Sequence, residues 1–374
     1  MPSFTSNSEA PDGTPSGIDG RWVTRDIPEQ PWYLLLAVVL CAVAMGTAGW
    51  EVYARSLGYG PSLDDTPNLW APQRARAVGA RRDQVVFVGD SRTLFDMDLA
   101  VFRNEIGGPE PIQLATVGSN PLIILEDLAK DTSFAGTAMV GLVPGLAAAA
   151  AGPPVANPTR FVTHYHHWTM ANRMELPLVI WLNERLAFLN EDLTLARLIE
   201  TKLPLPERPS VFSPRLPPYM YTLDRNRQAR MTEAVATNGA LQHQIQQGWL
   251  PLFRGPPRPA VFTPEQWGKM LSDGWESNLR RFKQSVASIQ ARGGRVIFSR
   301  PPSSGELYAL ERKNTPNAAF WDRVLAETGA PGINFEDHAE LQGFDCPEWS
   351  HLNARDATEY TKRFARILKA QALF

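Results

Sequence analysis

The chain has 374 residues, a formal net charge of −2 and a mixed composition in which 44% of the residues are hydrophobic. These values are typical of one large globular domain or two small ones, and they exclude a disordered or fibrous chain. The balance of 37 basic and 39 acidic residues lacks the electrostatic footprint of a nucleic-acid-binding protein, so we expect no nucleic-acid partner.

The chain begins with a polar segment followed by an apolar one. Residues 1–30 are rich in Ser, Pro, Gly and acidic side chains and are predicted to form a disordered tail. Residues 31–50 are predicted to form a transmembrane anchor, because no charged residue occurs from Trp32 to Trp50. A helix of that length rises roughly 28 Å, close to the thickness of a bilayer's hydrocarbon core. The alternatives are a buried helix of a soluble core and a signal peptide cleaved near Ala42-Val43-Ala44.

Charged residues on either side of the apolar segment favour one orientation in the membrane. Arg21 and Arg25 precede the segment, whereas Glu51 and Arg55 follow it. By the positive-inside rule, the amino terminus is expected in the cytoplasm. The rest of the chain is then expected on the extracytoplasmic, periplasmic side of the cell membrane.

Residues 51–82 are predicted to be a connector and residues 83–374 a folded domain. In that domain short apolar runs alternate with amphipathic stretches, a pattern typical of a parallel sheet covered by helices. We predict an α/β fold with a flavodoxin-like, three-layer arrangement, in which helices cover both faces of the sheet. The first elements are expected as strands over 84–88, 111–116 and 138–143, with helices over 94–106 and 121–130.

The third and fourth predicted strands are about 150 residues apart, which is far more than a crossover needs. We therefore expect an insertion at about 146–262, with a helical part over 171–202 and proline-rich parts over 204–218 and 251–259. It is predicted to form a cap over the sheet edge or a surface for a partner protein. The remaining elements are expected as a helix ending at 291–294, a strand over 295–299, a helix over 317–327, a strand over 332–335, and a last helix capped by Asn353 with Asp356 three residues on.

Two short segments carry the residues with candidate chemistry. Gly89-Asp90-Ser91 follows the first predicted strand, and Glu348-Trp349-Ser350-His351 precedes the last predicted helix. Both are expected at the edge of the sheet formed by the carboxyl ends of its strands, where open α/β folds bind ligands. A serine hydroxyl becomes a strong nucleophile when a base takes its proton, and the base works best when a third group fixes its tautomer. We predict these roles for Ser91, His351 and Glu348, respectively.

In their order and positions, these motifs resemble those of the SGNH (GDSL-like) hydrolase superfamily. The resemblance covers about residues 84–370 and includes a glycine turn after the second strand. It implies that Ser91 is the nucleophile, His351 the base, and the residue three before the histidine the acid. The superfamily usually has aspartate at that position; Glu348 has the same charge and one more methylene, and Asp345 is the alternative acid.

The resemblance also implies three donors to an oxyanion: the serine N–H, a glycine N–H after strand two and an asparagine after strand three. Gly118 suits the second donor. The expected asparagine is missing, since strand three continues into Gly141-Leu142-Val143-Pro144-Gly145. Asn120 is the candidate replacement. Because Pro121 follows it, Asn120 is also predicted to cap a helix, and one residue could do both through different groups.

The membrane segment and the Gly-Asp-Ser-Arg sequence resemble a membrane-anchored branch of the superfamily, which includes the D-alanyl transfer protein of teichoic-acid D-alanylation and polysaccharide O-acyltransferases. The resemblance implies a serine acyl-transfer enzyme, an O-acyltransferase or an acyl esterase, acting on a cell-envelope glycan or related ester. Its partners would be an acyl donor, a glycan or other hydroxyl acceptor, and a multi-pass membrane acyltransferase. The alternative is an inactive SGNH-like protein that binds glycan or scaffolds an envelope complex.

Two arginines are candidate substrate ligands. Arg92 follows the nucleophile and is expected either to hold an anionic group of the substrate or to pair with a nearby carboxylate. Arg300 begins the segment 300–306, which leaves the carboxyl end of the fourth strand and forms either part of the site or a rigid turn.

Other residues offer alternative chemistry. Cys346 lies close to His351 in sequence, but nothing nearby predicts the lowered thiol pKa that a nucleophile needs. His164, His166 and His167 could suggest a metal site; without a carboxylate or cysteine at ligand spacing, we expect a polar or substrate-facing loop instead. We predict no metal and no cofactor.

Overall fold

The structure is a computed structural model that describes residues 29–202, 216–255 and 257–374. The chain divides into two units, Met1–Gly49 and Trp50–Phe374. Apart from residues 29 and 30, the predicted tail lies outside the described residues.

The apolar segment near the amino terminus forms the helix α1 (Trp32–Ser56). The helix contains the predicted span except Pro31 and continues beyond Trp50 to Ser56. None of the residues in its most apolar window is buried in the structure. Its length and composition are sufficient to cross a membrane.

The predicted connector over 51–82 contributes to the hydrophobic core. The helix α2 (Pro67–Arg76) begins after Thr66, whose side chain caps it, and has proline at its first position. Trp70 is fully buried, and its indole Nε1–H donates to the carbonyl of Leu114 at 2.9 Å. This part of the chain therefore belongs to the folded unit.

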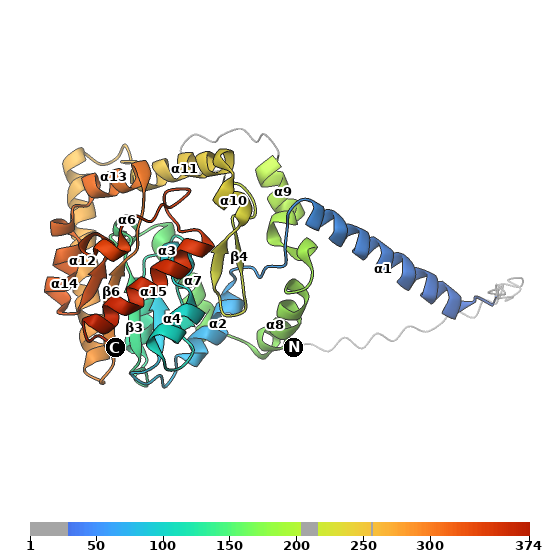
Figure 1. Ribbon diagram of the computed structural model, residues 1–374, viewed down its shortest axis with the longest axis horizontal. Coiled ribbons are helices and arrows are strands. Elements are labelled where there is room, and N and C mark those ends of the chain that lie inside the picture. Colours follow the sequence, from blue (N-terminus) through green and yellow to red (C-terminus); the bar gives the residue numbers. More distant parts are fainter. Residues whose placement is uncertain (1–28, 203–215, 256) are drawn as a thin grey trace, which may run out of the picture. The chain divides into compact units, whose positions relative to one another are not determined.

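Five parallel strands form the central sheet, in the order β2-β1-β3-β6-β7. Figure 1 labels two of them, β3 and β6. They are β1 (Val85–Val88), β2 (Ile112–Gln113), β3 (Thr137–Gly141), β6 (Arg295–Arg300) and β7 (Gly332–Asn334). The predicted α/β fold with a parallel sheet is thus confirmed, although β2 is shorter than expected. Every residue of β1 is buried, and the strand pairs with β2 on one side and with β3 on the other.

Alternate residues of β1 enter different clusters of buried side chains. Val86 and Val88 pack in one cluster with residues of α2, α5 (Leu122–Lys130), α12 (Pro264–Gln290) and α14 (Trp321–Thr328). Val85 and Phe87 pack in another with residues of α4 (Leu99–Ile106) and α15 (Ala354–Ala370). Because successive side chains of a strand point to opposite faces, the sheet is buried on both faces.

The predicted helix over 94–106 is in fact two helices, so that prediction was wrong. The first is α3 (Ser91–Asp96) and the second is α4. Asp98 separates them with an extended backbone, and its carboxylate accepts the N–H groups of Ala100 and Val101 at 3.1 Å. This local cap competes with a continuous helix, and it leaves α3 as a short element that begins at Ser91.

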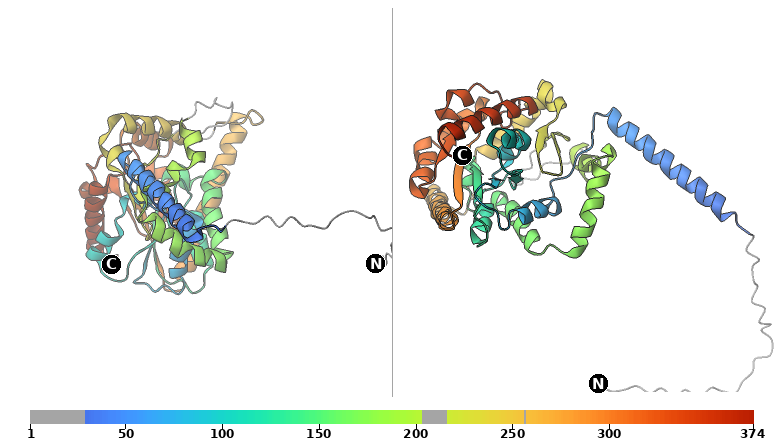
Figure 2. Two further views of the ribbon diagram at one scale, coloured as in Figure 1. Left: turned by 90° about the vertical axis from the view of Figure 1, so that its right-hand side faces the viewer. Right: turned by 60° about the horizontal axis from the view of Figure 1, so that its bottom comes forward.

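The segment between β3 and β6 contains most of the elements that could not be predicted individually from the sequence. Its helices α8 and α9 occupy the predicted helical part over 171–202 and form a column at one side of the folded unit (Figure 2). An antiparallel hairpin follows them. Of the predicted proline-rich parts, residues 204–215 lie outside the described chain, and Pro251 lies in the last turn of α11. Besides α12, the elements are α6 (Pro144–Ala147), α7 (Pro153–His166), α8 (Met170–Asn183), η1 (Ala187–Leu189), η2 (Glu191–Leu193), α9 (Leu195–Lys202), β4 (Tyr221–Leu223), β5 (Ala229–Met231), α10 (Glu233–Thr237) and α11 (Gly239–Phe253).

The carboxyl-terminal part follows the predicted order of elements. The last helix, α15, is capped as expected: the Asn353 side chain accepts the Asp356 N–H at 2.9 Å. The predicted helix over 317–327 is α14 preceded by a 3-10 turn. The further elements are α13 (Gly305–Asn314), η3 (Asn317–Ala319), η4 (Phe335–Asp337) and η5 (Ala339–Leu341).

Gly141 at the end of β3 lies against Thr93 of α3. A substitution at Gly141 therefore tests how tightly this end of the sheet is packed. A Cβ atom at Gly141 would lie 1.8 Å from Thr93 Oγ1. We expect Gly141→Ala to lower the free energy of unfolding by about 1 to 3 kcal/mol, as overpacking does. Urea unfolding followed by tryptophan fluorescence measures this.

The matched control removes the hydroxyl that causes the clash. Thr93 Oγ1 is buried and has no hydrogen-bond partner within the described residues. Thr93→Ala by itself should therefore lower the free energy of unfolding only slightly. In the double variant the nearest remaining Thr93 atom lies 3.2 Å from the new Cβ, and most of the lost stability should return. Additive losses in the double variant would contradict close packing at this position.

Candidate active site

Ser91 lies at the carboxyl end of β1, where the sequence predicted the nucleophile. Gly89 and Asp90 form the turn after the strand, and α3 begins at Ser91 itself. The Asp90 carboxylate caps this helix by accepting the Arg92 N–H at 2.8 Å. Gly89 permits the turn, because a Cβ there would lie 2.0 Å from the Thr93 hydroxyl. Ser91 remains partly exposed, while the residues on either side of it are buried.

His351 and Glu348 form a buried pair in the turn before α15. Glu348 Oε1 lies 2.7 Å from His351 Nδ1 and accepts the backbone N–H of His351 at 2.6 Å. The two side chains are at most 3% exposed. Asp345, the alternative acid, is exposed, so the carboxylate that orients the imidazole is that of Glu348.

The segments around Ser91 and His351 are in contact, although 260 positions separate them in the sequence (351 − 91). The ring of Phe95 lies 4.4 Å from the His351 ring, measured between centroids. The Leu352 N–H donates to Asp96 Oδ1 at 3.0 Å. Within the described residues, however, no hydrogen bond joins Ser91 Oγ to His351, and His351 Nε2 has no partner.

Helix α11, from the large segment between β3 and β6, covers the histidine. The indole N–H of Trp249 donates to Glu348 Oε2, and its ring meets the His351 ring edge-on with centroids 5.9 Å apart. Gln246 donates to the carbonyl of Pro347 at 3.0 Å. The sequence analysis expected a cap here but did not identify Trp249, because no local pattern links it to Glu348.

Electrostatic interactions in this buried site shift the pKa values of three groups. Burial alone would lower the pKa of His351, but the charge and hydrogen bond of Glu348 hold it above its usual range. Burial raises the pKa of Asp96 to about 7 and that of Asp90 to about 6, despite the opposing effects of nearby cations and backbone donors. At neutral pH the site therefore contains carboxyl groups close to their titration points.

Asp96 is a second residue that the sequence analysis missed. It is fully buried at the end of α3, and its Oδ2 has no partner within the described residues. The sequence did contain a signal, since Leu94-Phe95-Asp96-Met97 places an acidic residue in an apolar stretch. An acidic residue in a buried stretch points to a paired or functional group.

Gly118, the predicted oxyanion donor, lies in the turn after β2. Its φ angle of 62° favours glycine, and a Cβ there would meet nothing within 4 Å. No acceptor for its N–H is found among the described residues. Asn157 of α7 holds this turn by donating to the carbonyl of Val117 at 2.8 Å. The sequence analysis had no signal for Asn157, because it comes from a distant helix.

The geometry of Asn120 agrees with its helix-capping role and conflicts with the oxyanion role. Its side-chain oxygen accepts the Leu122 N–H at 3.0 Å at the start of α5. Its amide group donates to the carbonyls of Ala147 and Ala149 at 3.1 and 2.8 Å, and its backbone N–H donates to Pro154 at 2.7 Å. No donor of Asn120 is left for an oxyanion, so we correct that assignment.

The two candidate substrate arginines are buried and form ion pairs. Arg92 contacts Glu311 through two hydrogen bonds of 2.5 and 3.2 Å, so the pairing alternative holds for it. Arg300 contacts Asn317 and, at 3.1 Å, Glu336. Both are 1% exposed, so neither guanidinium faces a substrate in this structure.

The alternative chemical groups are also placed by the structure. Burial raises the pKa of the Cys346 thiol well above its usual range, which disfavours a nucleophilic thiolate. His164 and His166 lie in α7 and His167 caps it, so the expected loop was wrong. His166 contacts Asp127 at 2.6 Å, and the described residues contain no group of three or more side chains placed to hold a metal ion.

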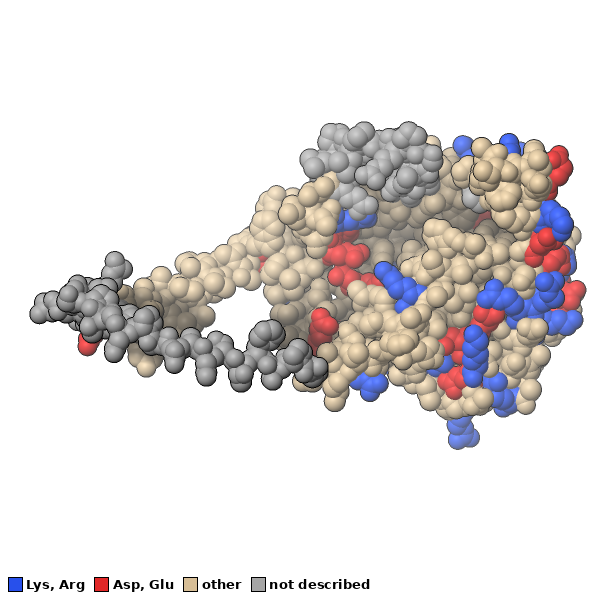
Figure 3. All heavy atoms as spheres, turned by 180° about the vertical axis from the view of Figure 1, so that it is seen from behind, with Lys and Arg blue, Asp and Glu red and all other residues tan. Residues whose placement is uncertain are grey.

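Basic and acidic side chains are interspersed on the face of the molecule that Figure 3 presents.

Neither a protein-family model nor a curated protein sequence matches the chain.

A substitution of Trp249 tests how the Glu348 carboxylate is held in place. Trp249→Phe keeps an aromatic ring but removes the donor to Glu348 Oε2, which stays buried. We expect kcat/KM for an ester substrate to fall about 10-fold, because the carboxylate loses a contact that fixes its position and a misplaced group slows the reaction. A carboxylate with one donor fewer stabilises the imidazolium more strongly, so the acid limb of the pH profile should move to higher pH. An unchanged profile would show that Trp249 only packs against the site.

Asp96→Asn should alter how stability depends on pH. Because the folded-state pKa of about 7 exceeds the reference value of 3.8, the folded state binds this proton more tightly than the unfolded state does. The stabilisation is present at low pH and is lost as the pH rises through 7. Asparagine does not titrate, so the stability of the variant relative to wild type should rise by roughly 2 to 3 kcal/mol between pH 5 and pH 8. Urea unfolding at both pH values measures this, and the exposed Asp345→Asn should show no such change.

Proposed function

We propose that the chain is a membrane-anchored, extracytoplasmic serine acyl-transfer enzyme. It would act as an O-acyltransferase or acyl esterase on a cell-envelope glycan or a related ester. The observation that supports this most directly is the buried Glu348–His351 pair, whose free Nε2 lies in a segment that packs against the helix beginning at Ser91. A base oriented by a carboxylate is one part of the arrangement that activates a serine nucleophile.

In the proposed reaction, Ser91 Oγ attacks the carbonyl carbon of an acyl ester while His351 Nε2 accepts the hydroxyl proton. The Glu348 carboxylate stabilises the imidazolium that forms. The N–H groups of Ser91 and Gly118 donate to the oxyanion. The ester's C–O bond then breaks, and the leaving alcohol takes the proton from His351.

The acyl-enzyme is resolved by a second attack. A glycan hydroxyl or a water molecule gives its proton to His351 and attacks the acyl carbon, and the proton then returns to Ser91 as its bond to the acyl group breaks. Transfer and hydrolysis share this intermediate and differ only in which hydroxyl reaches it. Helix α11 covers His351, so movement of this helix would control which acceptor enters.

The fold supports membership of the SGNH superfamily. The central sheet has the order β2-β1-β3-β6-β7, which corresponds to the flavodoxin-like order once the separate β4–β5 hairpin is set aside. We propose the corresponding three-layer arrangement for the domain. The serine after β1 and the histidine before α15 then occupy the positions that the resemblance implies.

The length and apolar composition of α1 support a single-pass anchor. The charged residues flanking the span favour an amino terminus in the cytoplasm and an acyl-transfer domain outside it. In this position the domain would take an acyl group from a donor, or from a multi-pass membrane acyltransferase beside it, and pass it to a glycan hydroxyl.

A second candidate function is an inactive SGNH-like protein that binds glycan or scaffolds an envelope complex. Two observations favour it: within the described residues Ser91 is not hydrogen-bonded to His351, and Asn120 supplies no donor to an oxyanion. A retained fold can carry a different function.

Labelling with a fluorophosphonate distinguishes the two candidates. The full-length protein in detergent should form a covalent adduct that peptide mapping places on Ser91, and Ser91→Ala should abolish it. Ser272→Ala, at an exposed position of α12, is the matched control and should label like wild type. Absence of both labelling and p-nitrophenyl acetate turnover above the Ser91→Ala level would reject the enzyme and favour the inactive protein.

A further inference from the structure

Helix α8 presents an apolar stripe to solvent. Four large side chains, each more than half exposed, recur every three or four residues and therefore share one side of the helix. These are Met170, Met174, Leu178 and Trp181. The opposite side of the helix packs inward through Leu176, which is buried in a cluster with residues of α3 and of the β4–β5 hairpin. Leu195 of α9 is also exposed.

Hydrogen bonds join the end of α8 to the last turns of α1. The Glu51 carboxylate accepts the N–H groups of Ala187 and Phe188 at 3.0 and 3.1 Å, just after α8. Arg55 donates to the carbonyl of Arg185 at 3.1 Å. Glu51 is the first charged residue after the uncharged run of α1, so it marks where that helix would leave a bilayer. These hydrogen bonds hold the end of α8 beside Glu51 and Arg55.

The side chains at both ends of the stripe suit a membrane interface. The Arg185 guanidinium lies 4.8 Å from the Trp181 ring centroid and donates to the Trp181 carbonyl at 2.9 Å. At the other end, the Arg173 guanidinium lies 4.7 Å from the ring of Trp168. Tryptophan is enriched at the headgroup level of bilayers, and arginine can bind lipid phosphate.

We propose that the outer side of α8, which carries Met170, Met174, Leu178 and Trp181, lies in the interface of the bilayer that α1 crosses. Lipid is the expected occupant because the stripe ends at Trp181, close in sequence to the residues that Glu51 and Arg55 of α1 contact, and because arginines flank it. The anchor makes this contact intramolecular, so a weakly binding face stays occupied. Docking at a second point would hold the domain in one orientation on the membrane. The proposal depends on α1 spanning a membrane and is independent of acyl transfer.

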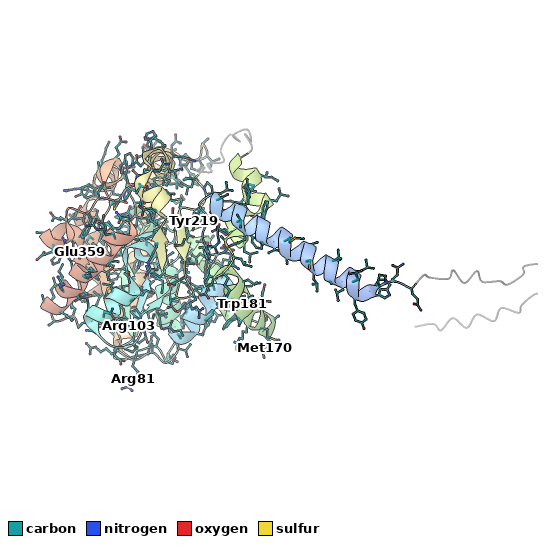
Figure 4. All side chains as sticks on the ribbon, turned by 45° about the vertical axis from the view of Figure 1, so that its right-hand side comes forward. Arg81, Arg103, Met170, Trp181, Tyr219 and Glu359 are labelled. Carbon is teal, nitrogen blue, oxygen red and sulfur yellow. The ribbon has the colours of Figure 1, made fainter. Side chains whose placement is uncertain are left out.

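Fluorescent labels on the full-length chain in phospholipid vesicles test the proposal. In a Cys41→Ala background, Met170→Cys and Trp181→Cys each receive an NBD probe, while Cys346 is fully buried. Arg81→Cys and Arg103→Cys are the controls; Figure 4 labels these exposed residues away from α8. Nitroxide-bearing phospholipid should quench at least half of the fluorescence at Met170 and Trp181 and little at the controls. Iodide should show the reverse pattern.

Three outcomes overturn the proposal. Labels at Met170 and Trp181 that behave like the controls show that the stripe faces water. Labels protected from iodide but insensitive to nitroxide lipid show that protein, such as a second copy of the chain, covers the stripe. Release of the chain from vesicles by alkaline carbonate shows that α1 is not inserted.

Discussion

Glu348→Gln should lower kcat/KM for ester substrates by about 10⁴-fold, the order of loss seen when a triad carboxylate becomes an amide. Glu348 accepts three hydrogen bonds, from His351 Nδ1, from the His351 backbone and from Trp249. Glutamine has one oxygen and one NH₂ group in place of the two carboxylate oxygens. Where the NH₂ group faces His351, it donates to Nδ1, so the imidazole carries its proton on Nε2 and that atom cannot take the Ser91 proton. Steady-state kinetics on the full-length enzyme measure the loss.

The pH profile gives this prediction a second readout. In the proposed reaction His351 acts as a base only when neutral, so the activity should rise with pH through a pKa above the usual value of about 6.5. Removing the Glu348 charge removes the main interaction that raises this pKa, so the acid limb of the residual activity should move to lower pH. Glu340→Gln, at an exposed position, should change neither rate nor profile. A loss of less than 10-fold with an unchanged profile would contradict the role of Glu348.

Glu311→Ala should lower the free energy of unfolding by about 3 to 5 kcal/mol, the usual effect of leaving a buried charge without its partner. Arg92 and Glu311 are 1% and 3% exposed and form two hydrogen bonds. Glu311 also accepts the Ser303 hydroxyl at 2.9 Å, and Arg92 Nε donates to Ser350 at 3.3 Å. The pair therefore links α3, α13 and the turn that contains the histidine. Urea unfolding of the single variant measures its contribution.

Two comparisons separate the buried charge from the loss of side-chain volume. Replacing both partners by methionine leaves no charge unpaired, so the Arg92→Met/Glu311→Met variant should recover most of the lost stability. Asp273→Ala breaks the exposed Lys269–Asp273 pair and should cost less than about 1 kcal/mol. If Glu311→Ala costs no more than Asp273→Ala, the buried pair does not stabilise the fold.

Features that depend on neighbours in the sequence could be predicted from it. The apolar run over 85–88 is a buried strand, Asn353 caps the last helix, and Glu348 lies within reach of His351 three residues on. In each case the interacting groups belong to one turn or one strand, so their spacing decides the geometry. The helix predicted over 94–106 failed for a local reason as well, since Asp98 caps its own following turn.

Contacts between distant segments could not be predicted in this way. Trp249 reaches Glu348 from α11, Asn157 holds the Gly118 turn from α7, and Arg92 pairs with Glu311 of α13. Each of these pairs depends on how the helices pack around the sheet. The spacing of residues within one segment carries no information about that packing.

The sequence by itself determined the α/β sheet, the apolar helix α1, and the order in which Ser91 and His351 occur, because strand burial, hydropathy and turn chemistry are local properties. Only the tertiary structure decided the role of Asn120. Its sequence allowed both a cap and an oxyanion donor, and the carbonyls of Ala147 and Ala149 occupy its amide. Packing likewise decided that α11 covers the histidine, because burial of its apolar side brings Trp249 against the Glu348–His351 pair.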